Sequence, residues 1–177
     1  SIKDIPDVFT NFRKKTEKDS EIRNPFDAPT KINSPEILPL ELPTLEALGL
    51  SKNTIDSRAV LQFKGGESEA LQRLNHYFFE TQCLSTYKET RNGLDGMSYS
   101  TKFSPWLSNG SISARQIICD LHQYESKIEA NESTYWIYFE LLWREYFQWY
   151  AHSHRANLFR FNGIKNSNPT TSFYPER

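Results

Sequence analysis

The chain has 177 residues, 14% of them aromatic, and a formal net charge of −1. This balance excludes a uniformly basic nucleic-acid-binding protein, so any affinity for nucleic acid has to come from local clusters of charge. Cys83 and Cys119 are too few for a disulfide framework and are expected to be buried free thiols. No run of 18 apolar residues and no charged-then-apolar leader occurs, so we expect an intracellular protein, cytoplasmic or organellar, without a membrane span.

The first 60 residues are expected to form a connector with one short helix. Pro6 suits a first helical turn, and Val8, Phe9 and Phe12 follow at helical spacing. The proline-rich stretch 24–43 has almost no periodicity, which indicates an extended segment that wraps a surface. The next residues, "LPTLEALGL", predict a single helical turn closed by a glycine.

Residues 61–177 are expected to form an all-α domain. The stretch 65–80 carries an apolar stripe, and "TYKETRNGLDGMSYS" after it is aperiodic and predicts a loop. Ser113 with Gln116 resembles a capping box for a helix to about Glu129, and "NEST" caps a long aromatic helix. The residues expected to face inward on the first two helices are Leu71, Leu74, Tyr77, Phe78, Ile117, Leu121 and Tyr124.

The stretch "STKFSPWLSNGSISARQI", residues 100–117, gathers hydroxyls, one lysine and two aromatic rings before the helix that begins at Ser113. Hydroxyls, an ammonium group and free helix N–H groups are all donors to anions, so the stretch suits a phosphate. Phe103 and Trp106 would give a flat cofactor a packing surface. The alternative is a solvated loop with an ordinary serine cap.

The last helix carries a carboxylate within an aromatic face. Its face at helical spacing consists of Trp136, Glu140, Trp143, Phe147 and Tyr150. Because an unpaired buried charge is very costly, Glu140 needs a partner. That partner is either Arg144, one turn along the helix, or a polar group of a ligand stacked on Trp143.

Two long stretches, "YKETRNGLDGMSYSTKFSPWLSNGSISARQI" and "STYWIYFELLWREYFQWY", resemble the photolyase/cryptochrome family, and most of all its DASH-type cryptochromes. The resemblance extends more weakly to "LPTLEALGL", "FKGGESEALQRL" and "DIPDVFTNFRK". It implies that residues 1–60 are the interdomain connector and that 61–177 are the first half of the family's FAD-binding helical domain. By this resemblance, the family's α/β domain and second run of helices lie outside the chain.

The resemblance also implies a cofactor. The positions that match the family's contacts with FAD, mostly at its phosphates, are Tyr87, Ser100, Thr101, Lys102, Phe103 and Ser104. The full-length family also holds an antenna pigment, which a folate can provide. The chain alone is expected to be inactive, and no catalytic residue is assigned within it.

For DNA, the resemblance places Glu140 and Trp143 against a damaged pyrimidine pair, with Arg144 in the pocket wall. It implies light-driven electron transfer from reduced FAD to a cyclobutane pyrimidine dimer. Because a base must leave the duplex to reach such a pocket, single-stranded or looped DNA is favoured. The alternatives are a blue-light photoreceptor without repair activity and a helical interaction module without flavin. His152 and His154 lack further ligands at metal spacing and are expected to form a solvated helix end.

Overall fold

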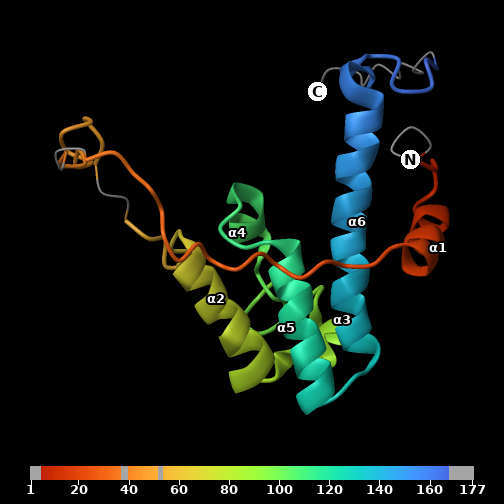
Figure 1. The fold of residues 1–177 in the computed structure, drawn as a ribbon, viewed down its shortest axis with the longest axis horizontal. Helices are drawn as coiled ribbons and strands as arrows, with labels where there is room; N and C mark the ends of the chain where they lie inside the picture. The colour runs from red at the N-terminus through yellow and green to blue at the C-terminus, as the bar shows by residue number, and fades with distance from the viewer. Residues whose placement is uncertain (1–4, 37–39, 52–53, 168–177) are drawn as a thin grey trace, which may run out of the picture. The chain divides into compact units, whose positions relative to one another are not determined.

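The computed structural model describes residues 5–36, 40–51 and 54–167. Helices and turns make up the regular structure of this described part and it contains no strand, which confirms the all-α prediction (Figure 1). The chain forms two compact units, one from residues 1–22 and 135–177 and the other from 23–134. No helix in the described ranges is both long and apolar enough to pass through a membrane.

In the first unit, α1 (Phe9–Asp19) packs on α6 (Glu132–His154) through aromatic rings. Helix α1 begins at Phe9, three residues after Pro6, with Val8 in the capping position. Phe9, Leu142 and Tyr146 form the buried core of this unit. The Tyr146 hydroxyl lies 2.9 Å from the Asp7 carbonyl oxygen and donates to it, which anchors the segment before α1.

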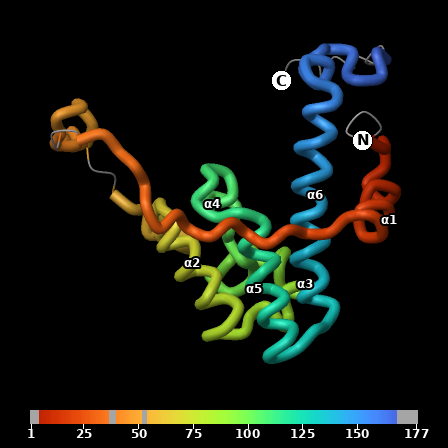
Figure 2. The backbone as a smooth tube through the Cα atoms, viewed as in Figure 1, coloured from red at the N-terminus to blue at the C-terminus, as the bar shows by residue number. Residues whose placement is uncertain are grey.

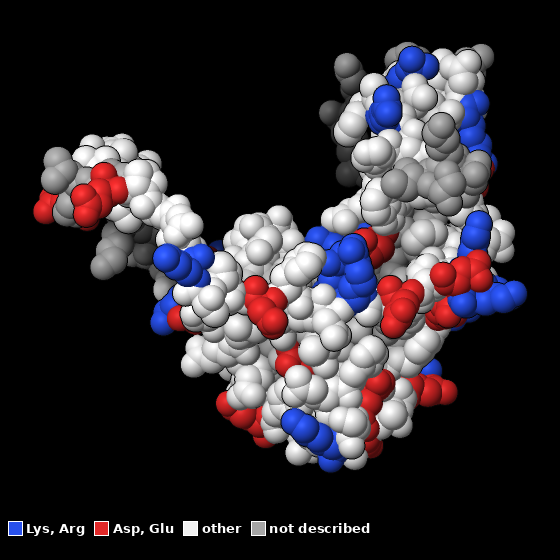
Figure 3. All heavy atoms as spheres, viewed as in Figure 1, with Lys and Arg blue, Asp and Glu red and all other residues white. Residues whose placement is uncertain are grey.

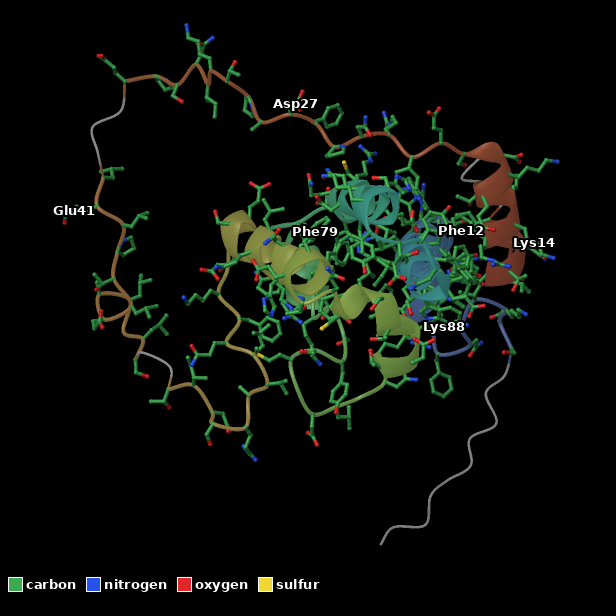
Figure 4. The ribbon with its side chains drawn as sticks, turned by 90° about the horizontal axis from the view of Figure 1, so that it is seen from below. Phe12, Lys14, Asp27, Glu41, Phe79 and Lys88 are labelled. Atoms are coloured by element: carbon green, nitrogen blue, oxygen red, sulfur yellow. The ribbon has the colours of Figure 1, made fainter. Side chains whose placement is uncertain are left out.

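Opposite sides of α1 have different surroundings. Figure 4 labels Phe12, which is half-buried against the core cluster, and Lys14, which points away from it into solvent. Tyr135 on α6 receives a hydrogen bond from Arg13 at 2.6 Å and donates one to Glu17 at 2.7 Å. The polar bonds therefore lie at the edge of a contact whose centre is aromatic.

In the second unit, α2 (Glu67–Asn75) continues into a π-helical turn, His76–Glu80. The predicted inward stripe is wrong at Leu71, which is 36% exposed, whereas Arg73 is 7% exposed. An arginine occupies this inward position because its guanidinium finds carbonyl partners there, as described below. Tyr77 and Phe78 are fully buried, as predicted.

Helix α5 (Ala114–Lys127) follows the predicted capping residue. The Gln116 N–H donates to the Ser113 hydroxyl at 3.0 Å. The reciprocal half of the capping box is missing, because the Gln116 side chain bonds Asp120 at 2.8 Å instead. The predicted inward residues of α5 are all buried: Ile117, Leu121 and Tyr124.

The stretch predicted as a loop after residue 85 is partly helical. A 3₁₀ turn, Cys83–Thr86, ends at its first residue, and one turn of α-helix, α3 (Tyr87–Thr90), follows within it. Tertiary bonds stabilise these turns: the Ser133 hydroxyl accepts from the Lys88 N–H at 3.0 Å and donates to Glu89 at 3.1 Å. Periodicity does not reveal so short a helix, because its support comes from a residue 45 positions away.

The stretch after α3 is irregular, as predicted, and it is tightly packed at a glycine. A Cβ at Gly93 would lie 2.6 Å from the Tyr99 ring, so a larger residue does not fit there. Helix α4 (Ser104–Asn109) then precedes α5. The cysteines are free, and both are half-buried where full burial was expected.

The described residues between α1 and α2 form no helix or strand (Figure 2). Within this stretch, "LPTLEALGL" forms the predicted single turn. The Gly49 N–H bonds the Glu46 carbonyl at 2.9 Å, and the Leu50 N–H bonds the Leu45 carbonyl at 2.8 Å. Gly49 has a φ of 73°, so the turn ends as a glycine-terminated helix end does.

Candidate functional site

Residues 100–103 form an irregular turn directly before α4. The sequence interpretation placed the donors beside the helix that begins after Ser113, but the short helix α4 lies between them. Lys102 has a φ of 59°, in the left-handed region, and Phe103 follows in the right-handed helical region at φ −75° and ψ −15°. Successive residues of opposite handedness turn their N–H groups into one concavity, an arrangement that binds anions.

The backbone donors of this turn have no protein acceptor. Within the described part of the chain, the N–H groups of Thr101, Lys102 and Phe103 form no hydrogen bond. The Lys102 amino group also has no hydrogen bond or ion pair there. Several N–H groups without a protein acceptor, together with an ammonium group, suit a phosphate or pyrophosphate.

The side chains of the turn divide between core and surface. Thr101 and Phe103 are buried, at 9% and 4% exposed, while Ser104 is exposed. The Phe103 ring lies 6.0 Å from that of Phe78. Trp106 is 4% exposed and its Nε1 donates to the Lys64 carbonyl at 2.8 Å. Both rings are therefore buried in the core, and they do not form the predicted packing surface for a flat cofactor.

Arg73 holds the turn from the side of α2. Its Nε donates to the Thr101 carbonyl at 3.0 Å, and its Nη2 donates to the Ser100 carbonyl at 3.1 Å and the Met97 carbonyl at 2.5 Å. Burial lowers the pKa of Arg73 from its usual value. Sequence reasoning missed this residue. The available signal was an arginine on the apolar stripe of α2, four residues before Tyr77.

Tyr77 connects Arg73 with Tyr87, the first residue of α3. The Arg73 guanidinium lies 5.2 Å from the centre of the Tyr77 ring, and the Tyr87 ring meets Tyr77 edge-on at 6.4 Å. Tyr87 is 5% exposed. The Thr90 hydroxyl on α3 donates to the Tyr99 carbonyl at 2.9 Å. The structure thus brings Tyr87 and residues 100–104 into one unit.

The aromatic face of α6 belongs to the other unit and is described separately. The Trp143 ring stacks on Phe9 at 3.7 Å with an interplanar angle of 17°, and on Phe147 at 5.3 Å. Trp143 nevertheless remains partly exposed, as do Glu140 and Arg144. Arg144, one of the two partners considered for Glu140, pairs with Glu145 instead, at 2.9 Å between Nη1 and Oε1.

The second unit has a cavity of about 230 Å³ that Arg73 helps to line, and no residue of the turn 100–103 is among its lining residues. Its walls combine apolar and ionisable side chains, from Leu61, Gln62, Glu69, Gln72, Arg73, His76, Glu80, Met97 and Trp106. Among the residues that the structure describes, no three His, Cys, Asp or Glu side chains gather closely enough to hold a metal ion.

The chain is similar to curated cryptochromes of the DASH type over its full length. It is 50% identical to "Cryptochrome DASH" of Vibrio parahaemolyticus over 100% of this chain and 38% of that protein. It is 45% identical to "Cryptochrome DASH" of Danio rerio over 91% of this chain and 31% of that one. The chain therefore spans about a third of the length of the curated relatives that it matches. No family model matches it.

A solved structure agrees with these relatives. The crystal structure of the Synechocystis sp. PCC6803 cryptochrome matches the chain with a TM-score of 0.86 and 44% sequence identity. The match covers 95% of this chain and 35% of that one. Sequence and structure thus identify the same family.

Proposed function

Because the chain belongs to the photolyase/cryptochrome family, with DASH-type cryptochromes as its relatives, we propose that it forms part of the FAD-binding domain of such a protein. Residues 61–177 are the first half of that domain in this proposal, and residues 1–60 are the connector that leads into it. FAD is held at its pyrophosphate by residues 100–104, with Tyr87 as a further contact.

The observation that carries the proposal is the turn with unpaired N–H groups at Thr101, Lys102 and Phe103. A pyrophosphate needs several donors within a few ångströms and a positive charge nearby, and this turn offers both. No glycine is present in the turn, so Lys102 itself adopts the left-handed φ. We therefore assign the phosphate contacts to backbone N–H groups, the Lys102 ammonium and the Ser104 hydroxyl.

When bound, reduced FAD would supply light-driven electron transfer to a cyclobutane pyrimidine dimer and would take the electron back after the ring is split. The residues of this chain contribute binding and orientation. Thr101 and Phe103 fix the turn in the core, which directs the donors between them. On α6, Glu140 accepts a hydrogen bond from a base edge, the exposed part of Trp143 stacks on the base, and Arg144 forms part of the pocket wall.

The flavin assignment is tested by comparing two lysine variants in the intact protein. Lys102→Ala is expected to lower the FAD content of the purified protein, because it removes the only side-chain cation of the turn. Lys14→Ala is the matched control, since Lys14 is exposed on α1. The measurement is the ratio of flavin absorbance to protein absorbance. Equal ratios in the two variants would contradict the assignment.

The DNA assignment concerns a chain whose positive and negative charges nearly balance, with a formal net charge of −1. On the face shown in Figure 3, Lys and Arg side chains are interspersed with Asp and Glu side chains. Recognition of DNA on such a face depends on local contacts more than on a continuous basic stripe. We propose a damaged pyrimidine pair as the ligand, with single-stranded DNA favoured, because unpaired bases cost less to expose.

Binding titrations with damaged and undamaged single strands test this proposal. Trp143→Ala is expected to remove about 1–3 kcal/mol of preference for the damaged strand. Trp149→Ala, on the same helix and 38% exposed, is the control and is expected to keep the preference. If Trp143→Ala weakens both strands by the same factor, Trp143 serves packing alone. Light-dependent loss of dimers then separates a repair enzyme from a photoreceptor that binds the same cofactor.

We also propose that the full-length protein holds the family's antenna pigment, with a folate as the candidate. Its test is the absorbance spectrum of the intact protein after the flavin has been removed. A remaining near-ultraviolet band that follows the protein through gel filtration would support an antenna.

A further inference from the structure

Arg73 makes an unusual set of contacts for a buried arginine. It is 7% exposed, and all three of its hydrogen bonds go to backbone carbonyls of one later segment, at Met97, Ser100 and Thr101. No carboxylate pairs with it within the described part of the chain. The guanidinium thus acts on the backbone of the turn, and carbonyl dipoles and the Tyr77 ring help to balance its positive charge.

These bonds determine which way the turn presents its donors. In a planar trans peptide the carbonyl and the next N–H point in opposite directions. Because the Ser100 and Thr101 carbonyls point to Arg73, the N–H groups of Thr101 and Lys102 point away from it. These are two of the N–H groups that have no acceptor in the described part of the chain.

The same bonds remove an obstacle to anion binding. Carbonyl oxygens carry partial negative charge and repel a phosphate, so a turn that binds one has to direct them elsewhere. Arg73 binds three of them with the planar fork that only an arginine offers. A lysine at this position keeps the charge but lacks the fixed geometry that reaches all three.

We propose that Arg73 is a positioning residue for the phosphate-binding turn, which it holds with its carbonyls inward and its N–H groups outward before any ligand is bound. The inference rests on the proposed function, because it takes FAD as the occupant of the turn. Arg73 itself does not contact the ligand. It also stabilises the left-handed φ of Lys102, which is unfavourable for a residue with a Cβ.

The test uses three variants of the intact protein. Arg73→Lys removes the fork and keeps the charge, and Lys102→Ala removes a proposed ligand contact. Leu74→Ala shortens a side chain that is 3% exposed at the position after Arg73, and it keeps Arg73 and every residue of the turn. Two quantities are measured below the melting temperature. The dissociation constant of FAD is measured by fluorescence in all three variants, and the rate of tryptic cleavage after Lys102 is measured in Arg73→Lys and Leu74→Ala stripped of flavin, because Lys102→Ala lacks that cleavage site. Arg73→Lys leaves the trypsin sites unchanged in number.

Arg73→Lys is expected to weaken FAD binding by about tenfold, since two or more charge-assisted hydrogen bonds lose their geometry. It is also expected to speed cleavage after Lys102 in the flavin-free protein, because the turn opens more often. Leu74→Ala is expected to lower the thermal stability while leaving both quantities near those of the unmodified protein.

Two results would overturn the inference. One is an unchanged FAD dissociation constant and cleavage rate in Arg73→Lys, and the other is an equal loss of FAD affinity in Leu74→Ala, which would reduce the effect to general stability. Failure of the proposed function has a different signature. In that case Lys102→Ala leaves FAD binding unchanged, whatever Arg73→Lys does to the cleavage rate.

Discussion

The turn at residues 100–103, which we propose binds phosphate, and the aromatic face of α6 are held in place by different kinds of contact. In the turn, a buried arginine binds three backbone carbonyls, and the groups left for a ligand are backbone N–H groups and one lysine. On α6, Trp143 is held by ring stacking at 3.7 Å, and the group left for a ligand is the exposed part of the same ring. A substitution of Arg73 is therefore expected to change the orientation of the N–H groups of the turn. A substitution of Trp143 is expected to change the packing of α1 on α6 and the proposed binding of a base together.

The largest loss of stability is expected at Phe9, in the centre of the aromatic contact between α1 and α6. Phe9→Ala removes a ring that is 6% exposed and lies against Trp143, Phe139 and Tyr146. We expect the free energy of unfolding to fall by about 3–5 kcal/mol, measured by denaturant titration. Phe26→Ala is the control: this ring is 87% exposed, and its removal is expected to change stability by less than about 0.5 kcal/mol. Similar losses in both variants would show that α1 is not held by its rings.

A smaller effect is expected at the polar cap of α5. Ser113→Ala removes the hydroxyl that accepts from the Gln116 N–H at 3.0 Å. Because the other half of the capping box is absent, we expect a loss of about 1 kcal/mol in the free energy of unfolding. Ser111→Ala, two residues earlier, is matched in size, and the Ser111 hydroxyl makes no hydrogen bond in the described ranges. If Ser111→Ala lowers the free energy of unfolding as much as Ser113→Ala does, the Ser113 hydroxyl does not stabilise α5 as a cap.

The smallest effect at neutral pH is expected for Tyr77→Phe, about 1 kcal/mol or less, because the ring beneath Arg73 is kept. At alkaline pH, however, the unmodified protein and Tyr77→Phe are expected to differ in stability. Burial is the main cause that raises the pKa of Tyr77 above its usual value of 10.0, and nearby Cys83 adds to it. A raised pKa in the folded state stabilises the protein below pH 10 and loses that contribution as the pH rises further.

Stability of the unmodified protein is therefore expected to fall above pH 10, and to fall less steeply in Tyr77→Phe. Some slope remains in the variant, since burial also raises the pKa of Tyr124 and Tyr138. Chemical denaturation at several pH values between neutral and strongly alkaline measures both slopes. Parallel curves for the two proteins would contradict the burial of the Tyr77 hydroxyl.

The helices could be predicted from sequence where their support is local. The stripe of α5 and the caps at Ser113 and Asn131 are set by spacing and residue type within one turn. Helix α3 could not be predicted in the same way, because Ser133 supports it from a distant part of the chain. The burial of Arg73 also depends on carbonyls more than 20 residues away in the sequence, which the spacing of apolar residues does not reveal.

The candidate site was likewise predictable only in the features that depend on neighbouring residues in the sequence. The residue types of 100–104 indicated a phosphate, and the resemblance assigned it to FAD. The sequence could not show that Phe103 and Trp106 are taken up by the core, or that Lys102 adopts a left-handed φ without a glycine. It also left the partner of Glu140 open between Arg144 and a ligand, and in the structure Arg144 pairs with Glu145 instead.

The central claim is that the unpaired N–H groups of the turn receive the phosphates of FAD. Amide hydrogen exchange of the intact protein, with and without flavin, tests it most directly. Without flavin, the amides of Thr101, Lys102 and Phe103 are expected to exchange fast, because they have no acceptor in the described part of the chain. Flavin is expected to slow all three. Unchanged fast exchange at these amides in fully loaded protein would contradict the account.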